Sequence, residues 1–158
     1  VDRFIMKVVV GYPKMHEEQM ILRQNTQQSL SSQKIKQVVS VQEVMNAKEL
    51  TLQIYMDEKI EKYILDIVFA TRKPEEYKLE KLKPLISYGA SPRGSINLGL
   101  ASKAQAFLNK RGFEIPEDVR SICQDVLRHR IGLTYEAEAE NVKVEDVIED
   151  VLRMINVP

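Results

Sequence analysis

The segment Gly89-Ala90-Ser91-Pro92-Arg93 begins the clearest helix of the sequence and guides the interpretation of the rest. Serine is a preferred N-cap residue, and proline fits the first helical position because its missing N–H has no partner there. Apolar residues then recur at helical spacing up to Lys110, before Gly112 stops the helix: Ile96, Leu100, Ala104 and Phe107. The pattern predicts a helix over 91–110 whose apolar stripe faces a core.

Two helices are predicted before this segment. Ser40, followed three residues later by Glu43, forms a capping box that opens a helix ending near Leu52. We expect three of its apolar side chains to face inward: Val41, Val44 and Met45. Asp57 can cap the next helix, whose apolar residues share one face opposite a charged one: Ile60, Ile64, Ile67 and Val68.

Two amphipathic helices are predicted after it. Pro116 begins the first, whose inner face is apolar: Val119, Ile122, Cys123, Val126 and Leu127. The second covers residues 144–155, and residues 128–135 break the helical pattern with room for a short extended piece. Together these segments predict a mainly α fold, a helical bundle.

The N-terminal part has a different pattern. The β-branched run Ile5 to Val10, closed by Gly11-Tyr12-Pro13, predicts a mostly buried strand, but no sheet partners follow it in the sequence. Lys14 to Gln27 predicts a helix with a polar face. The serine- and glutamine-rich residues 27–34 predict a flexible connector, which is the best hinge candidate.

Residues 72–88 contain Pro74 and Pro84 and alternate lysine with glutamate, which predicts a long surface excursion with at most a short helical turn. The chain is therefore divided into three predicted units. Residues 1–13 hold the terminal strand, residues 14–34 the helix and linker, and residues 35–158 the helical domain.

Composition argues against several classes of function. Lysine plus arginine (23) balance aspartate plus glutamate (23), so no bulk positive field favours nucleic acid or an anionic membrane. No apolar run approaches the roughly 20 residues that span a bilayer, and no secretory pattern opens the chain, so we expect a cytoplasmic protein. Cys123 is interpreted as a buried hydrophobe. His16 and His129 lack partners at ligand spacing, so we expect no metal site.

Arg93 is the strongest candidate for a functional side chain. It lies near the second position of the predicted helix, where the helix dipole disfavours a cation by about 0.3 to 1 kcal/mol. The same helix end presents free N–H donors, so an arginine beside it can help to clamp a phosphate oxygen. The alternative is a solvated arginine, or one paired with a carboxylate such as Glu80, and the local physics alone favours this alternative.

The segment 89–93 resembles the sensor-2 signature of the MoxR branch of AAA+ ATPases. Two further blocks match that family in the expected order, Val126-Leu127-Arg128-His129-Arg130 and Tyr135-Glu136-Ala137-Glu138-Ala139-Glu140. Asp2-Arg3-Phe4, followed by an apolar run, is similar to the end of the family's ATPase core. The resemblance covers nearly the whole chain, and its most specific parts are the blocks 89–93 and 127–130.

The resemblance implies a machine in which an α/β core binds ATP and magnesium and a helical lid closes over it. Residues 35–158 would be the lid, and the strand at 5–10 would be left over from the ATPase core. Arg93, with Ser91 and Pro92, would contact the ATP phosphates as a sensor rather than as a base or nucleophile. The chain has no Gly-x-x-x-x-Gly-Lys-[Ser/Thr] loop and no strand ending in paired acids. We therefore expect neither hydrolysis nor tight nucleotide binding by this chain alone.

Arg3 is the second candidate. In several AAA+ branches an arginine just before the last core strand acts in trans on the nucleotide of the neighbouring subunit, which implies a ring oligomer. Such an arginine finger is worth about 10³- to 10⁵-fold in rate where it operates. The alternative is a structural ion pair with Asp2 or with the core, and both interpretations stay open.

The remaining charged blocks have structural interpretations. Arg128, His129 and Arg130 follow a predicted helix at its C-terminal end, where cations complement the dipole, and His129 is expected to be partly buried and bonded to backbone. Gly94 is expected to loosen the first turn of its helix by about 1 kcal/mol relative to alanine. An acidic run is interpreted as a solvated face without chemistry: Glu136, Glu138 and Glu140.

Two hypotheses about function remain. The resemblance implies part of a chaperone-like, ring-forming remodeller that works with von Willebrand factor A-domain partners, and the sequence does not identify its client. The alternative is an autonomous helical module that binds a partner protein through an exposed apolar strand or helix face. Both predict the same bundle, and they differ in the role of Arg93.

Overall fold

The core helices begin where the capping signals predict them. The computed structural model describes residues 2–27 and 36–158. The core is built from α3 (Glu58–Arg72), α4 (Pro92–Leu108), α5 (Pro116–Leu127) and α7 (Val144–Met154). Asp57 Oδ1 accepts the N–H of Lys59 at 2.9 Å, and Ser91 Oγ accepts the N–H of Arg93 at 3.2 Å. Both predicted N-caps are confirmed.

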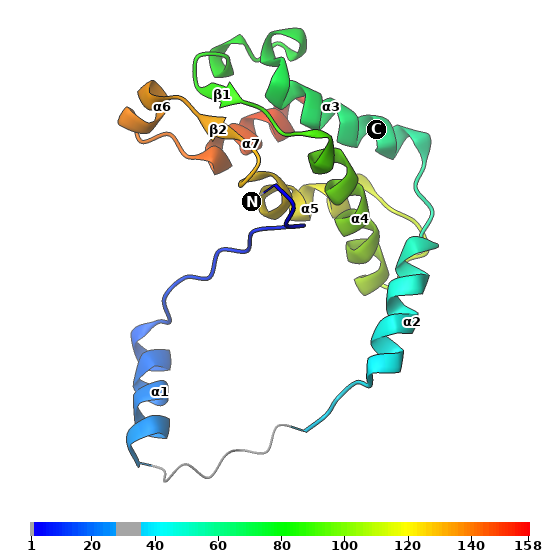
Figure 1. Ribbon diagram of the computed structural model, residues 1–158, viewed down its shortest axis with the longest axis vertical. Helices are drawn as coiled ribbons and strands as arrows, with labels where there is room; N and C mark the ends of the chain where they lie inside the picture. Colours follow the sequence, from blue (N-terminus) through cyan, green and yellow to red (C-terminus); the bar gives the residue numbers. More distant parts are fainter. Residues whose placement is uncertain (1, 28–35) are drawn as a thin grey trace.

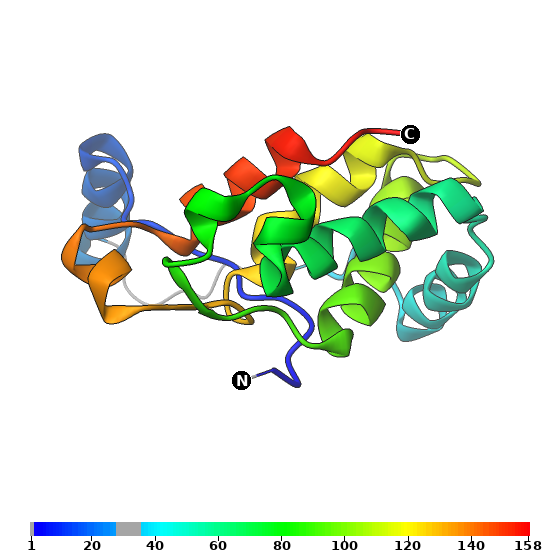
Figure 2. The same ribbon diagram turned by 90° about the horizontal axis from the view of Figure 1, so that it is seen from above.

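These four helices pack around one core. α3 contacts α4, α5 and α7, and α4 lies along α5 (Figures 1 and 2). Several aliphatic side chains at their contacts are fully inaccessible to water: Ile67, Val68, Leu98, Val119, Val126, Leu127, Ile148 and Val151. Burying one such side chain stabilises the fold by about 1.5 to 3 kcal/mol. The prediction of a mainly α bundle is confirmed.

Short elements connect the core helices. They are the 3₁₀ helices η1 (Pro74–Tyr77) and η2 (Glu80–Leu82), the strands β1 (Ile86–Tyr88) and β2 (Gly132–Leu133), and α6 (Tyr135–Ala139). The strands pair antiparallel, with Ile86 opposite Leu133 and Tyr88 opposite Gly132, so the break at 128–135 holds the expected extended piece.

The predicted surface excursion over 72–88 is wrong in one respect. Leu79 and Leu82 are 1% and 2% exposed and belong to the hydrophobic core. The segment therefore covers the bundle with two leucines while its lysines and glutamates face solvent. The alternation of charges concealed these leucines because each stands alone between polar residues.

α4 buries a different face from the predicted one. Ile96 is 60% and Leu100 39% exposed, whereas the buried residues are mostly small: Gly94, Leu98, Ala101, Ser102 and Ala106. Small side chains let α4 approach its neighbours closely. At Gly94 a Cβ would lie 3.1 Å from Ala90 Cβ and 3.3 Å from Leu127 Cδ2. Close packing therefore accounts for this glycine better than a loosened first turn does.

The N-terminal helices are exposed. α1 (Met15–Gln27) stands apart from the bundle in Figure 1, and α2 (Val41–Leu52) lies near one end of α4. The Ser40 capping box is confirmed, but α2 has no buried residue. The three side chains predicted to face inward are 82%, 55% and 48% exposed, so that prediction is wrong: Val41, Val44 and Met45.

The segment predicted as a strand, Ile5 to Val10, has no strand structure, and residues 6–14 lie without regular secondary structure. Strand structure needs the hydrogen bonds of a neighbouring strand. Here the N–H of Lys7 donates to the carbonyl oxygen of Asp125 in α5, at 2.7 Å, and Met6 packs against the core.

The predicted connector over 27–34 lies almost wholly outside the described residues, so the hinge and the boundaries of the three units stay predictions. Among the residues that the structure describes, no helix is long and apolar enough to cross a membrane.

Candidate functional site

The residues before Arg93 fix the start of α4 to the end of α3. A Cβ at Gly89 would lie 2.4 Å from the carbonyl oxygen of Thr71, so glycine is required for the chain to pass so close. Ala90 is fully buried, and its N–H donates to Thr71 Oγ1 at 3.0 Å. Arg72 Nε donates to the Ala90 carbonyl oxygen at 2.5 Å. The base of Arg93 is therefore anchored rather than carried on a loose loop.

Ser91 and Arg93, on either side of Pro92, bring polar side chains to the N-terminus of α4. Ser91 Oγ lies 3.0 Å from each carboxylate oxygen of Asp2, and Arg93 Nη1 lies 3.3 Å from Asp2 Oδ2. The Arg93 side chain is 56% exposed. The predicted alternative of an ion pair is thus observed, but the partner is Asp2 rather than Glu80.

Arg130 holds the N-terminal segment against this site. Its side chain is fully buried, and its guanidinium donates to the carbonyl oxygens of Asp2 and Ile5, at 3.1 and 3.3 Å, and to that of Phe4. Nε also lies 3.3 Å from Asp2 Oδ1. A buried cation is costly unless it is paired and hydrogen-bonded, and here the residues 2–5 supply both. Arg130 is therefore more than a cation that complements the end of α5.

The charges around Asp2 keep its carboxylate ionised. Desolvation opposes ionisation, but hydrogen bonds from Ser91 and Arg93 and the charges of Arg130 and Arg93 outweigh it and lower the pKa of Asp2. Burial has the leading effect at Arg130 and lowers its pKa, while Asp2 acts in the opposite direction. The site thus binds one anion between two arginines.

Arg3 is exposed and follows Asp2 in a turn. Within the described residues Asp2 pairs with Arg93 and Arg130, not with Arg3. The predicted structural pair between Asp2 and Arg3 is therefore absent from this part of the chain. His129 behaves as expected, because its Nε2 lies 3.1 Å from the carbonyl oxygen of Phe4.

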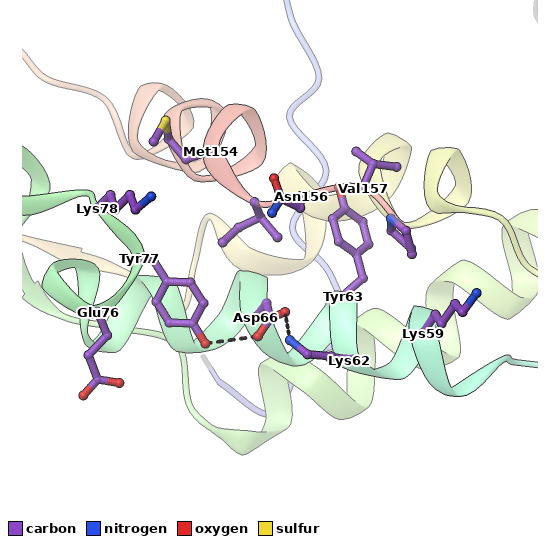
Figure 3. A pocket seen from close by; sticks show the side chains of 12 residues that line it. Lys59, Lys62, Tyr63, Asp66, Glu76, Tyr77, Lys78, Met154, Asn156 and Val157 are labelled. Carbon is purple, nitrogen blue, oxygen red and sulfur yellow. Dashed lines mark hydrogen bonds and ion pairs between the residues drawn. The ribbon is translucent and has the colours of Figure 1, made fainter.

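A separate cavity of about 570 Å³ lies between α3, η1 and the residues after α7 (Figure 3). Its central polar groups bind one another, since Asp66 accepts from Lys62 Nζ at 2.5 Å and from the Tyr77 hydroxyl at 3.2 Å. None of the predicted site residues lines it. In the part of the chain that the structure describes, no group of three or more His, Cys, Asp or Glu residues is placed to hold a metal.

Comparison with known proteins identifies the bundle. The family model of the AAA lid domain matches residues 81–151, which contain α4, α5 and Arg130. Over 157 residues the chain is 35% identical to the chaperone MoxR1 of Mycobacterium tuberculosis, covering 99% of this chain and 41% of that protein. The chain carries an AAA lid domain and is similar to MoxR proteins over nearly its whole length.

Other relatives agree with this lid assignment. The chain is 29% identical to the protein MoxR of Paracoccus denitrificans, over 99% of this chain and 49% of that protein. A crystal structure of a protein assigned as an ATPase from Cytophaga hutchinsonii matches with a TM-score of 0.91 and 39% identity, over 99% of this chain and 47% of that one. The chain spans less than half the length of these relatives.

The sequence predicted Arg93, Ser91 and Pro92 as site residues, and it did not predict that Asp2 and Arg130 gather beside them. The structure joins the blocks 2–4, 89–93 and 126–130, each of which carries the family resemblance. Opposite charge was the available signal: Arg93 and Arg130 lie in two of these blocks, and Asp2 is the acidic residue of the third.

Proposed function

We propose that this lid senses the nucleotide state of an AAA+ ATPase through Arg93 and converts it into lid movement. The observation that supports the proposal is an exposed cation at the N-terminus of α4, already holding an anionic group in the form of the Asp2 carboxylate. An ATP phosphate offers negative charge, as the carboxylate does, and oxygen atoms that accept the same hydrogen bonds. ATP and magnesium would be held mainly by an ATP-binding core.

The packing of α4 explains how a contact at Arg93 moves the lid. Gly89 and Ala90 tie the base of α4 to α3, and α4 packs along α5. A displacement of Arg93 therefore moves α4 together with the helices packed against it, and not one loop alone. Domain closure around a ligand works in this way when packed elements move as one body.

Other parts of the function are proposed from the relatives. Similarity to a protein named as a chaperone supports remodelling of protein complexes as the activity of the parent protein. A ring oligomer and von Willebrand factor A-domain partners are proposed from the family resemblance alone. Arg3 is proposed as the finger that acts on the nucleotide of a neighbouring subunit. Its exposure and the pairing of Asp2 with other arginines leave its guanidinium available for this role.

The test is ATP hydrolysis by the full-length protein carrying Arg93→Ala. We expect the rate to fall on the order of 10²-fold, since a fixed charge at the phosphates is lost. Arg153→Ala is the matched control, because Arg153 is a surface arginine of α7 with a 65% exposed side chain. In the same assay Arg3→Ala should lower hydrolysis without weakening ATP binding to the same subunit.

Hydrolysis at the wild-type rate by the Arg93→Ala variant would contradict the sensor role. That outcome would favour the interaction module, in which exposed apolar residues of α1, such as Met15, Ile21 and Leu22, bind a partner protein. For this chain alone, calorimetry with magnesium and ATP should show at most weak binding, and micromolar affinity would contradict the assignment.

A further inference from the structure

We propose that Asp2 is the resident anion of the Arg93 site and that an ATP phosphate must displace its carboxylate before it can bind Arg93. The inference rests on the proposed sensor role and adds a built-in competitor to it. In the absence of nucleotide the carboxylate occupies Arg93, and with ATP bound the two anions exchange places.

The carboxylate already takes the donors that a phosphate would need. Ser91 Oγ is 3.0 Å from both of its oxygens, and Arg93 Nη1 is 3.3 Å from Oδ2. A phosphate oxygen on Arg93 would meet a second negative charge at contact distance, which is unfavourable in either order of binding. Both anions therefore cannot use these donors at full strength.

Arg130 acts as the positioning residue for this competitor. Its hydrogen bonds to the backbone carbonyl oxygens of Asp2, Phe4 and Ile5 do not depend on where the Asp2 carboxylate lies, and only the ion pair of Nε with Asp2 Oδ1 does. The side chain of Asp2 can turn away while residues 2–5 stay fastened to the lid. A tethered competitor acts at a high effective concentration, so it remains ready to return when the phosphate leaves.

The charge environment favours exchange over simultaneous binding. Arg93 is more than half exposed, whereas the Arg130 side chain is fully buried and reached through the residues 2–5. A phosphate coming from solvent therefore meets Arg93 first and leaves Arg130 to its carbonyl partners. The displaced carboxylate is 38% exposed and can be hydrated after a rotation of its side chain.

The experiment compares Asp2→Asn with the wild type in the full-length protein, by titration with magnesium and ATP and, separately, with magnesium and ADP. We expect ATP to bind about fivefold or more tightly to the variant, a typical size for a coupling between two sites. ADP affinity should change much less, since ADP lacks the terminal phosphate that Arg93 would contact. Asn keeps the size of the side chain, and thermal unfolding checks that the fold is kept.

Two matched variants make the result specific. Asp150→Asn removes the same charge from α7, where Asp150 pairs with Lys81 at 2.7 Å, and should leave ATP affinity unchanged. In an Arg93→Ala background, Asp2→Asn should have no further effect on ATP affinity, because the two substitutions act through one interaction.

Each contrary outcome has a distinct meaning. If Arg93→Ala weakens ATP binding but Asp2→Asn leaves it unchanged or weakens it, Asp2 orients Arg93 and the competitor role is wrong. An equal gain for ATP and ADP would also overturn it, because the effect would then be general electrostatics. If Arg93→Ala changes neither affinity nor hydrolysis, the sensor role itself fails.

Discussion

α3 in the bundle and α2 in the N-terminal part carry equally good start signals and have opposite burial. We call residues 54–158 the body and residues 8–27 and 36–52 the arm. Asp57 caps α3 in the body and Ser40 caps α2 in the arm, yet seven residues of α3 are buried and none of α2 is. A cap satisfies N–H groups locally and fixes where a helix begins. Burial depends on which other elements the helix packs against, and the N-cap residue does not indicate those elements.

The comparison predicts where the free energy of unfolding resides. Helices of 12 or 13 residues, such as α2 and α1, are marginal in water without packing. The arm should therefore contribute little to the cooperative unfolding of the body, which has its own core.

The largest expected effect comes from one substitution made in both regions. Ile67→Ala in α3 removes a fully buried side chain and should lower the free energy of unfolding by about 2 to 5 kcal/mol. Ile21→Ala in α1, where the side chain is 50% exposed, should change it by less than about 0.5 kcal/mol. Urea unfolding followed by circular dichroism measures both. Equal losses of unfolding free energy in the two variants would show that α1 is packed in solution and would contradict the distinction between body and arm.

A glycine pair tests the same contrast through the backbone. Gly89→Ala puts a Cβ 2.4 Å from the Thr71 carbonyl oxygen, which forces α3 and α4 apart and should cost about 1 to 3 kcal/mol. The new Cβ of Gly11→Ala has no atom of the described residues within 4 Å, its chain neighbours apart, so this substitution should be neutral. Thermal unfolding of the two variants gives the comparison. A neutral Gly89→Ala would mean that the base of α4 is less tightly held than the structure shows.

One glutamate in the body and one in the arm contribute to stability with opposite dependence on pH. Burial raises the pKa of Glu114, which is 5% exposed, and hydrogen bonds from the backbone and side chain of Ser40 lower the pKa of Glu43. Both start from an ordinary value of 4.5. The contribution of Glu114 to stability is full below that value and is lost as pH rises through its higher folded pKa. The contribution of Glu43 is full above 4.5 and is lost as pH falls through its lower folded pKa.

Replacing each glutamate by glutamine should reveal the direction of its pH dependence. Glu114→Gln should stabilise the body by about 1 kcal/mol at pH 7, because it removes an ionised carboxylate whose buried Oε2 has no hydrogen-bond partner among the described residues. The gain should vanish at low pH. Glu43→Gln should slightly reduce helix content at pH 7 only. Unfolding and circular dichroism at pH 7 and pH 4 provide the measurement, and a Glu114→Gln gain that grew on acidification would have the wrong sign.

Local signals allowed much of the body to be predicted from the sequence. In the body, Asp57, Ser91 and Pro116 each mark a helix that begins at the predicted residue or the one after it, and Ser40 does the same in the arm. The inner face of α4 was mispredicted because Ile96 and Leu100 are more apolar than the small residues that allow close packing. Hydrophobicity ranks side chains by transfer free energy, and it does not register how near a neighbouring helix can come.

The site was predicted in part for a similar reason. Arg93 belongs to a motif of five consecutive residues, 89–93, so it can be recognised from one stretch of sequence. Its partner Asp2 is 91 positions away, and the clamp formed by Arg130 on Asp2 spans 128 positions. Long-range pairing of this kind depends on the packed bundle, because α4 and α5 must be in place before either contact exists.

The same clamp has a consequence for the order of folding. Closing a loop of this length costs conformational entropy, which rises only with the logarithm of the loop length. This entropy is lost before the contacts of the clamp can compensate for it. The bundle can assemble from nearer contacts first, so we expect residues 2–5 to dock last and to detach first in partial unfolding. The anion site at Arg93 is then complete only in molecules whose bundle has finished folding.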